Sequence, residues 1–483
     1  MKRTLTSPSA VVFLLTAGMS ASAEDAKTWM EAAGEREQIA ARLDTITSDL
    51  SEAAALDEAQ ISSLAEYQIG TYMQTESFAQ GKDIVPGDES TWVPLYDLEG
   101  NHFADLVPLV EVGSGEIGFI TMGAIADGFS QYMIDWSTGL LDACRKALEE
   151  DPQAQAVFFP PMEYGLQSGT GINRRIYQFN MSDYSLEDIT GIVAENAEAF
   201  ARQYQIIRSP ENEEKTELAL ANAERMEMGL APKATLQAAK ARSGQAQAFS
   251  LAAVTKEDVR LVNEAHGKFV PVYDSSETYY GGDQDWYKAK TDKDGNLIVG
   301  SGAIPGREDN GCGPVAAANI MCYMSKEKAA YKMLYPYTSL EKDTFFEFMI
   351  TMYTAIDPAP FGEISYDSFS SDIKKWAKRQ GITLTSHSYS ASTYDNVPTA
   401  DAIKAGLKKN KPVAALNLKY GYVDPKKDVK VGWHWVTITK YFQSTDNTRW
   451  IAVSTWGRRQ SLDWDAYWKA CHSAYRSGYV WFE

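Results

Sequence analysis

The cysteine with the most unusual surroundings in this sequence is Cys312. It lies between Gly311 and Gly313 in the stretch D-N-G-C-G-P-V-A-A-A-N, which continues as an alanine-rich helical pattern. A thiol in the first turn of a helix is close to unpaired backbone N–H groups and to the positive end of the helix dipole, and both favour the thiolate. Pro314 suits a first turn because its missing N–H costs nothing there. The stretch therefore predicts a nucleophilic cysteine with a pKa below the usual value of about 8.5.

A thiol nucleophile needs a base that accepts its proton, and histidine is the usual choice. The histidines of the sequence are His102, His266, His387, His434 and His472. His434 stands in G-W-H-W-V-T-I-T-K-Y, a strand pattern that places His434, Val436 and Ile438 on one face. Taken singly, a buried structural cysteine and a structural histidine would be the simpler interpretations. Because the other histidines have no comparable setting, we predict that His434 is the base for Cys312.

A histidine base is held by a third group that orients its ring. A second strand pattern, R-W-I-A-V-S-T-W-G, follows the turn-like stretch Q-S-T-D-N-T. If the two strands form an antiparallel hairpin, Ser454 can share a face with His434 and accept the N–H of its ring. Alternatively, the Ser454 hydroxyl bonds to nearby backbone. In that case Asp446 and Asn447 in the turn are the first candidates for the orienting group.

These motifs resemble papain-like cysteine peptidases, and more closely the secreted bacterial branches of that clan: the streptopain type and the peptidase domains that process double-glycine leaders. The resemblance rests on N-G-C-G-P-V-A-A-A-N, G-W-H-W-V-T-I and V-S-T-W-G, which occur in the clan's order and cover roughly residues 255–483. It implies that Cys312 is the nucleophile and that His434 is the general base and acid. It also implies that Trp456 shields the pair from water.

Two positions depart from the pattern of the clan. Ser454 stands where the clan usually has asparagine or aspartate, and a serine hydroxyl fixes the imidazole less firmly. The glutamine that usually lies a few residues before the nucleophile is absent from P-G-R-E-D-N-G. Asn310 or the more distant Gln284 is therefore the candidate donor to the oxyanion, beside the backbone N–H of Cys312.

The elements that must position these residues alternate between helical and strand patterns. The N-terminal part shows helical spacing at 25–80, a hairpin around Glu99, Gly100 and Asn101, a further strand at E-I-G-F-I-T-M-G, and helical patterns near 130–150 and 185–205. The C-terminal part shows the Cys312 helix, several further helices, and closing strands that begin at Pro412, His434 and Trp450. Between them, the stretch from about 211 to 250 is charged and then Ala/Gln/Ser-rich, which predicts a solvated helix and a flexible connector.

We therefore expect an α+β fold with three segments. Residues 1–23 combine a basic start, an apolar run and a small-residue cleavage site, which is typical of a secretory signal peptide. Residues 24–245 are predicted to form a smaller α+β domain that resembles the inhibitory pro-region of streptopain-type zymogens. Residues 250–483 are predicted to form a papain-like catalytic domain, with Cys312 at a helix N-terminus and His434 in an antiparallel sheet. The mature protein should be secreted or periplasmic.

Composition limits the classes of partner. With 46 basic and 65 acidic residues, the formal net charge of −19 disfavours nucleic acid and anionic membranes. No segment after residue 23 has the apolar length of a membrane span. Four cysteines (Cys144, Cys312, Cys322 and Cys471) are too few for a disulfide framework in 483 residues. The histidines are scattered and D-K-D-G-N at 292–296 is typical of a hairpin turn, so we expect no metal and no cofactor. The oligomeric state is left open.

The function that these features favour is a secreted cysteine peptidase, made as a precursor, that acts on a protein or peptide substrate. Two alternatives keep the same residues. One is a catalytically weak or silent binding protein on a peptidase fold, which the departures at Ser454 and before Cys312 favour. The other is an enzyme that uses the same pair to transfer or cleave other amides, such as an amide transferase or a cell-wall peptidase.

Overall fold

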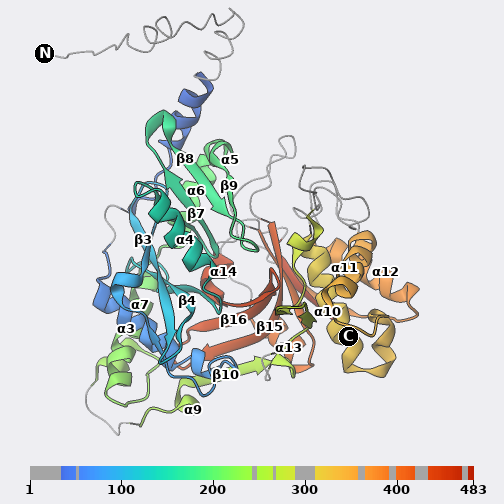
Figure 1. Cartoon of the computed structure of the whole chain (residues 1–483). Coiled ribbons are helices and arrows are strands. Elements are labelled where there is room, and N and C mark those ends of the chain that lie inside the picture. The colour runs from blue at the N-terminus through green and yellow to red at the C-terminus, as the bar shows by residue number, and fades with distance from the viewer. Residues whose placement is uncertain are drawn as a thin grey trace, which may run out of the picture.

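The structure is a computed structural model that describes most of the chain. The described residues are 34–50, 54–241, 247–264, 268–288, 311–356, 365–390, 399–418, 433–469 and 477–483. The predicted signal peptide at 1–23 and the predicted turn at 292–296 lie outside them, as do His266, Asn310, Cys471 and His472. Figure 1 shows a mixed α+β molecule in which the N-terminal region and the C-terminal region lie side by side.

Helices and strands alternate along both regions. The α-helices are α3 (Glu58–Gly70), α4 (Gly139–Glu150), α5 (Thr190–Glu195), α6 (Ala197–Ile206), α7 (Pro210–Glu227), α8 (Leu236–Lys240), α9 (Leu251–Val254), α10 (Cys312–Glu327), α11 (Lys342–Ile356), α12 (Tyr366–Arg379), α13 (Asp401–Lys408) and α14 (Trp464–Lys469). The 3₁₀ helix that bears on the site is η6 (Gln284–Tyr287).

The strands are β1 (Ile84–Pro86), β2 (Val93–Tyr96), β3 (His102–Glu111), β4 (Gly115–Gly123), β5 (Gln131–Asp135), β6 (Gln155–Phe159), β7 (Glu163–Ser168), β8 (Arg175–Phe179), β9 (Leu186–Asp188), β10 (Thr255–Arg260), β11 (Pro271–Tyr273), β12 (Thr278–Tyr280), β13 (Ser386–Ser390), β14 (Val413–Leu418), β15 (Trp433–Ser444), β16 (Arg449–Thr455), β17 (Arg458–Asp463) and β18 (Gly478–Phe482). β11 and β12 form a small hairpin of their own.

One large sheet runs through both regions. Within the described residues it has 16 strands, in the order β13-β18-β14-β15-β16-β17-β5-β4-β3-β2-β6-β7-β8-β9, with β1 added to β3 and β10 added to β15. Its pairs are antiparallel except for β2 with β6. The two regions meet where β17 pairs with β5, with Ser461 opposite Ile134. The predicted boundary between 245 and 250 therefore separates two stretches of sequence whose strands form a continuous sheet.

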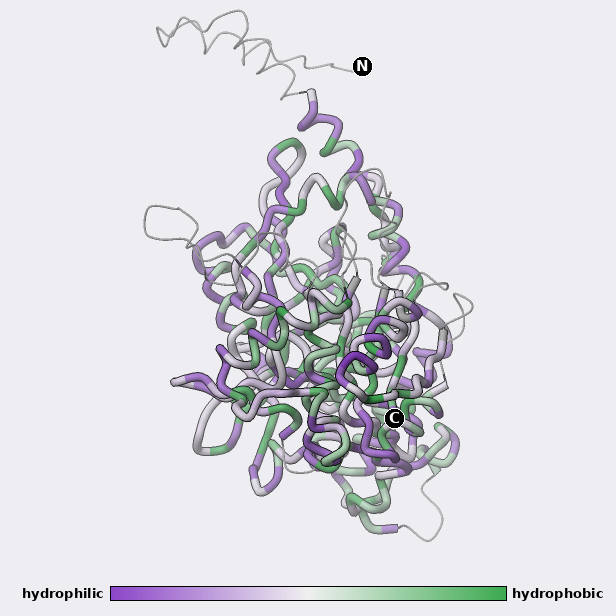
Figure 2. Tube along the Cα trace, turned by 90° about the vertical axis from the view of Figure 1, so that its right-hand side faces the viewer, coloured by the Kyte–Doolittle hydropathy of each residue, from purple (hydrophilic) through white to green (hydrophobic). Residues whose placement is uncertain are grey.

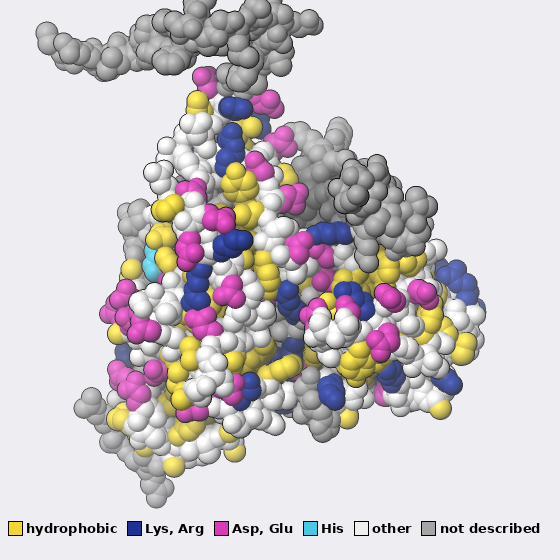
Figure 3. All heavy atoms as spheres, viewed as in Figure 1, with side chains coloured by type: hydrophobic (Ala, Val, Ile, Leu, Met, Phe, Trp, Pro, Cys, Tyr) yellow, Lys and Arg dark blue, Asp and Glu magenta, His cyan; other side chains and the backbone are white. Residues whose placement is uncertain are grey.

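Helices cover the sheet in separate layers. In the N-terminal region α3 packs against α7, β1 and β4. In the C-terminal region α10 packs against β14, β15 and α11, and α11 packs against α12 (Figure 1). Figure 2 shows that hydrophobic stretches gather inside the molecule and hydrophilic ones lie on its outside. Figure 3 shows acidic and basic side chains interspersed over one face. Among the described helices, none has the length and apolar character needed to cross a bilayer.

The two regions share a hydrophobic core. Tyr72, which follows α3, stacks on Trp450 of β16 with ring centroids 4.8 Å apart and planes 10° apart. The ring centroid of Phe442 of β15 lies 5.3 Å from that of Tyr72. All three side chains are buried in one cluster that also holds residues from α3, β3, β4 and α7. Because apolar side chains of both regions fill this cluster, burial of apolar surface stabilises the two regions against each other.

A buried ionic cluster also joins the two regions. Glu76 of the N-terminal region forms ion pairs with Lys440, at 2.7 Å, and with Arg459, and Arg459 also pairs with Glu264 at 2.6 Å. All four side chains are exposed by no more than 2%. Burial alone would raise the pKa of Glu76, but Arg459 and Lys440 hold it below its usual range. Removal of one member would leave a buried charge uncompensated, so each region depends on charges of the other.

The structure tests the predicted elements of the N-terminal region. The hairpin around Glu99, Gly100 and Asn101 is confirmed as β2 and β3, and the strand that follows is confirmed as β4. The helical prediction near 130–150 is confirmed for α4 but wrong for 131–135, which is the buried strand β5. The helical prediction near 185–205 is confirmed by α5 and α6, after the short strand β9. Strand β5 was missed because all five of its side chains are buried, so no alternation marks it.

The structure also tests the predicted elements around the site. A helix does begin at Cys312, and the closing strands are confirmed as β14, β15 and β16. β15 and β16 form the predicted antiparallel hairpin. The helix predicted in the charged stretch after residue 210 is α7, but it is only partly solvated. Leu218 is buried against α8 and Ala219 against α3, because α7 packs on both helices.

Candidate active site

Cys312 is the first residue of α10 and follows the N-cap residue Gly311. The first helical hydrogen bond runs from the backbone N–H of Val315 to the Gly311 carbonyl, at 2.9 Å. The helix then continues through small buried side chains, among them Ala316 and Ala317, which let α10 lie close to β15. The Cys312 side chain is half-buried and lies at the positive end of this helix. The local sequence thus places the thiol as predicted.

The predicted direction of the Cys312 pKa is wrong. Burial raises the pKa of the thiol, and this effect outweighs the hydrogen bonds from the backbone N–H groups of Trp435, Gly313 and Cys312, which lower it. The prediction considered the helix N-terminus and left out desolvation, which disfavours the charged thiolate. At neutral pH the resting cysteine therefore favours the thiol. A nearby base is needed if this cysteine is to attack a carbonyl.

His434 lies near the start of β15 with its ring held from two sides. Its Nε2 atom forms a hydrogen bond with the Oγ1 atom of Thr455, at 2.6 Å. The indole of Trp456 stacks on the imidazole, with ring centroids 4.5 Å apart and planes 14° apart. Trp456 has a backbone φ of +48°, which is unusual for a residue with a side chain. The stacked indole covers one face of the imidazole, in keeping with the shielding position that the resemblance implies.

A β-bulge decides which hydroxyl reaches His434. Lys440 lies opposite Ala452, but Ile438 lies opposite Val453, so Thr439 is an extra residue in β15. Without this shift, Ser454 would lie opposite Ile438 and would share the face of His434. A one-residue shift moves side chains to the other face of a strand. Thr455 therefore takes the place predicted for Ser454.

Ser454 has a different set of partners from the predicted one. Its hydroxyl donates to the Tyr280 carbonyl at 2.5 Å and accepts from the Nδ2 atom of Asn319 at 3.3 Å. The Oδ1 atom of Asn319 in turn accepts the backbone N–H of Gly282 at 2.9 Å. Ser454 and Asn319 thus fix the chain just before Gln284. The predicted role of Ser454 as the group that orients His434 is corrected to a backbone-holding role.

The predicted residues meet in one narrow pocket. It is lined by Gln284, Cys312, Val315, Ala316, Asn319, His434, Trp435, Ser454, Thr455 and Trp456. The helix start, the strand pair β15–β16 and η6 each contribute to this list. Of the two predicted oxyanion donors, Gln284 lines the pocket and Asn310 lies outside the described residues. Thr455 directly follows Ser454 and also carries a hydroxyl, so the sequence offered it as a partner for His434. The bulge that places Thr455 on the His434 face does not change the hydrophobic pattern, so the sequence could not show which hydroxyl is used.

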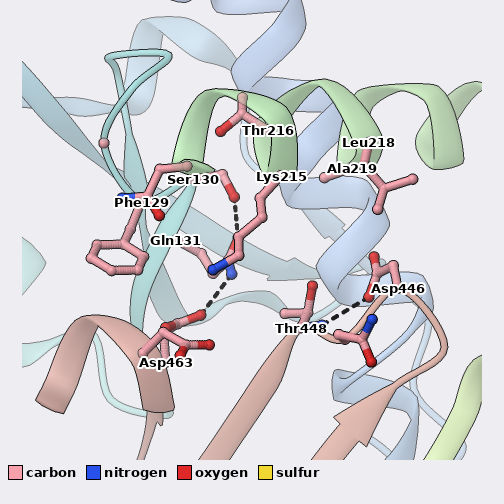
Figure 4. A pocket seen from close by; sticks show the side chains of 14 residues that line it. Phe129, Ser130, Gln131, Lys215, Thr216, Leu218, Ala219, Asp446, Thr448 and Asp463 are labelled. Atoms are coloured by element: carbon pink, nitrogen blue, oxygen red, sulfur yellow. Dashed lines mark hydrogen bonds between the residues drawn. The ribbon is translucent and has the colours of Figure 1, made fainter. Parts of the chain in front are cut away.

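A second small pocket lies where the two regions meet (Figure 4). It has a volume of about 40 Å³ and is lined by side chains from the start of β5, from α7, from the β15–β16 turn and from the end of β17. Gln131 donates to Asp463 at 2.7 Å, as Figure 4 shows. Burial and the charge of Asp465 raise the pKa of Asp463 to about 7. This pocket contains neither cysteine nor histidine, so it offers no thiol–imidazole pair.

The other cysteines in the described part of the chain are structural. Cys144 of α4 and Cys322 of α10 are fully buried and free. Burial raises the pKa of each thiol to about 12. Among the described residues there is also no group of three or more His, Cys, Asp or Glu side chains arranged to hold a metal ion.

Searches of protein-family models, curated proteins and solved structures with this chain find no match.

Proposed function

We propose that the protein is a secreted cysteine peptidase, made as a precursor, that hydrolyses peptide bonds through an acyl-enzyme formed on Cys312. The observation that carries this proposal is the shared pocket of Cys312 and His434. In it the thiol lies at a helix start, and the imidazole is bonded to Thr455 and stacked on Trp456. A nucleophile, a base and an orienting group within one pocket are what covalent acyl transfer requires.

The proposed reaction begins with proton transfer from the Cys312 thiol to His434. Because Nε2 is bonded to Thr455, the proton goes to Nδ1. The thiolate attacks the peptide carbonyl carbon, and the carbonyl oxygen becomes an oxyanion. The C–N bond then breaks as His434 returns the proton to the leaving amine, which leaves a thioester on Cys312. Water, deprotonated by His434, attacks the thioester, and a carboxylic acid and the free thiol result.

The oxyanion needs hydrogen-bond donors where the negative charge develops. The backbone N–H of Cys312 lies at the free N-terminal end of α10, where helical N–H groups have no partner within the helix. Gln284 lines the same pocket, and its side-chain amide is the proposed second donor. The sequence predicts Asn310 or Gln284 as the donor beside the Cys312 N–H, and Asn310 lies outside the described residues.

The test is labelling with a thiol-directed epoxide, together with hydrolysis of a fluorogenic peptide library. We expect the epoxide to attach to Cys312 and hydrolysis to stop in proportion to labelling. His434→Ala should lose both, while Cys322→Ala, a buried cysteine on the same helix, should keep both. If the wild type is folded but neither labels nor hydrolyses any peptide, the protein is no peptidase.

The silent-scaffold alternative keeps one specific observation in its favour. The pKa of Cys312 is raised by burial, and His434 bonds to the hydroxyl of Thr455, where the clan usually has asparagine or aspartate as the orienting group. A silent scaffold would show slow alkylation of Cys312 and no loss of that reactivity in His434→Ala. The same labelling experiment therefore separates the two functions.

A further inference from the structure

The N-terminal region sends one loop to the edge of the candidate active site. This loop, residues 180–185 between β8 and β9, is held in shape by its own hydrogen bonds. The Ser182 backbone N–H donates to the Oδ1 atom of Asn180, and the Tyr184 backbone N–H donates to the Asn180 carbonyl, each at 2.8 Å. Tyr184 has a φ of +59°, a conformation that side-chain-bearing residues adopt only when their surroundings require it.

The first set of contacts from this loop reaches the residues on both sides of Gln284. Ser182 donates to the Oδ1 atom of Asp283 at 2.9 Å, and Asn180 donates to Asp285 at 3.1 Å. Lys288 bridges the two regions, because it pairs with Asp285 at 2.6 Å and with Asp183 of the loop at 2.9 Å. Asp283 is the N-cap of η6, so these contacts bear on the start of the helix that carries Gln284.

The second set of contacts reaches the chain beside Trp456. Arg458 donates to the Ser182 carbonyl at 2.8 Å and to the Met181 carbonyl at 3.1 Å, and its guanidinium lies 4.6 Å from the Tyr184 ring centroid. Arg458 is separated from Trp456 by Gly457 alone. The backbone of Gly457 exchanges hydrogen bonds with the chain before Gln284, accepting from Tyr280 at 2.7 Å and donating to Gly282 at 3.1 Å.

We propose that the loop 180–185 positions Gln284 and Trp456 for catalysis, so the N-terminal region is a lasting part of the working enzyme. The proposal rests on the proposed peptidase function. Ser182 is central because it makes both contacts. Its hydroxyl bonds to Asp283, next to Gln284, and its carbonyl accepts from Arg458, two residues after Trp456. A pro-region that only blocked a cleft would have no need to fix the residues beside the oxyanion donor and the shielding indole.

The sheet and the ionic cluster make this arrangement lasting. If a precursor is cut between α8 and α9, β5 still pairs with β17, and Glu76 still pairs with Lys440 and Arg459. The loop also forms part of the wall of a cavity of about 680 Å³. Ser182 of the loop lines this cavity together with Asp283 and Arg458, which contact the loop. Trp456 lines it too, so the cavity adjoins the site. Loss of the N-terminal region would remove one wall of that cavity.

The test uses the full chain and counts active sites by epoxide titration. Ser182→Ala and Asn180→Ala should lower kcat per titrated site about three- to tenfold and change KM by less than twofold, because Gln284 acts on the transition state. Ser182→Thr keeps the hydroxyl and should restore kcat. The control is Ser185→Ala, since the Ser185 hydroxyl is exposed and bonds within the loop to Asp183. Wild-type kcat per site in both alanine variants would overturn the proposal.

A second measurement separates this proposal from the peptidase function. If the wild type hydrolyses no peptide, the proposed function fails, and iodoacetamide alkylation of Cys312 then tests the loop without a substrate. Looser packing of Trp456 and Gln284 should raise the alkylation rate at least threefold in Ser182→Ala and Asn180→Ala, but not in Ser185→Ala. Equal rates in all four proteins would overturn the positioning role.

A protein with a specific cleavage site inserted between Ala241 and Gln247 tests whether the N-terminal region is lasting. After complete cleavage, we expect both fragments to co-elute on size exclusion and the kcat per titrated site to stay within twofold of the uncut value. Separation of the fragments with retained activity would show that the N-terminal region is dispensable.

Discussion

The Cys312 pocket and the joint between the two regions both contain residues of β15, yet they use their polar groups differently. In the joint, charged and polar groups are paired across the regions: Gln131 with Asp463, and Glu76 with Lys440. In the Cys312 pocket, a thiol and an imidazole line the same space. Polar groups thus indicate catalysis where they include a nucleophile and a base, and they indicate a stabilising contact where opposite charges are paired.

The largest expected effect is the loss of turnover in Cys312→Ala. Removal of a catalytic nucleophile costs about 10⁴-fold or more in kcat. The free energy of unfolding should change by less than about 1 kcal/mol, since the half-buried side chain loses one sulfur atom. Steady-state kinetics and urea unfolding check the two parts. Residual turnover above one per cent of the wild-type value would show that another residue is the nucleophile.

In the joint, Glu76→Gln should lower the stability of the fold and leave turnover nearly unchanged, the opposite of Cys312→Ala. This change leaves Lys440 and Arg459 with one carboxylate fewer in a buried setting, and breaking such a pair destabilises by about 3–5 kcal/mol. Turnover per titrated active site should stay within twofold of the wild type. Urea unfolding together with epoxide titration measures both quantities. A fall in turnover per site of more than twofold, with unchanged stability, would contradict the division of roles.

Asp463 should make the stability of the joint depend on pH. Its pKa is raised to about 7 in the folded state, against about 3.9 when unfolded, so the folded state binds the proton more tightly. Stability from this group is present below about pH 4 and is lost as pH rises to about 7. Asp463→Asn should therefore gain stability relative to the wild type as pH rises over this range, by up to about 4 kcal/mol at pH 7, because each pKa unit corresponds to about 1.4 kcal/mol. Unfolding at several pH values checks the slope. A constant difference between the two proteins would show that Asp463 does not titrate in this window.

The smallest expected effect separates the two neighbouring hydroxyls of β16. Thr455→Ala removes one hydrogen bond to His434, worth roughly 0.5–1.5 kcal/mol, so kcat should fall by about tenfold at most. Thr455→Ser should keep most of the activity. Ser454→Ala should leave the pH profile of kcat unchanged, because its hydroxyl bonds to the Tyr280 carbonyl. A larger loss in Ser454→Ala than in Thr455→Ala, at equal stability, would reverse the assignment.

Much of the site was open to prediction from local sequence. The glycines and Pro314 around Cys312 predict a helix start, and α10 begins there. The apolar alternation around His434 predicts a strand, and β15 covers it. Local patterns succeed here because helix caps and strand faces are set by residues near one another in the chain.

Other features depend on contacts that the sequence does not show. The bulge at Thr439 places Thr455, and not Ser454, on the face of His434, and no residue type in the sequence predicts this bulge. The pKa direction of Cys312 depends on how deeply its helix start is buried. The continuity of the sheet depends on β5 meeting β17, far apart in the chain. Each is decided by tertiary packing, which a single sequence leaves open.

The central claim is that Cys312 and His434 act as a pair, and the pH dependence of Cys312 alkylation tests it most directly. The rate of reaction with iodoacetamide should be measured from pH 4 to 10 in the wild type and in His434→Ala, both in a Cys322→Ala background and shown to be folded. We predict that the wild type reacts well below pH 8, because His434 accepts the thiol proton. In His434→Ala the rate should rise only above the usual thiol pKa of about 8.5, because burial raises the pKa of Cys312 and no imidazole accepts its proton. Identical profiles in the two proteins would contradict the pairing.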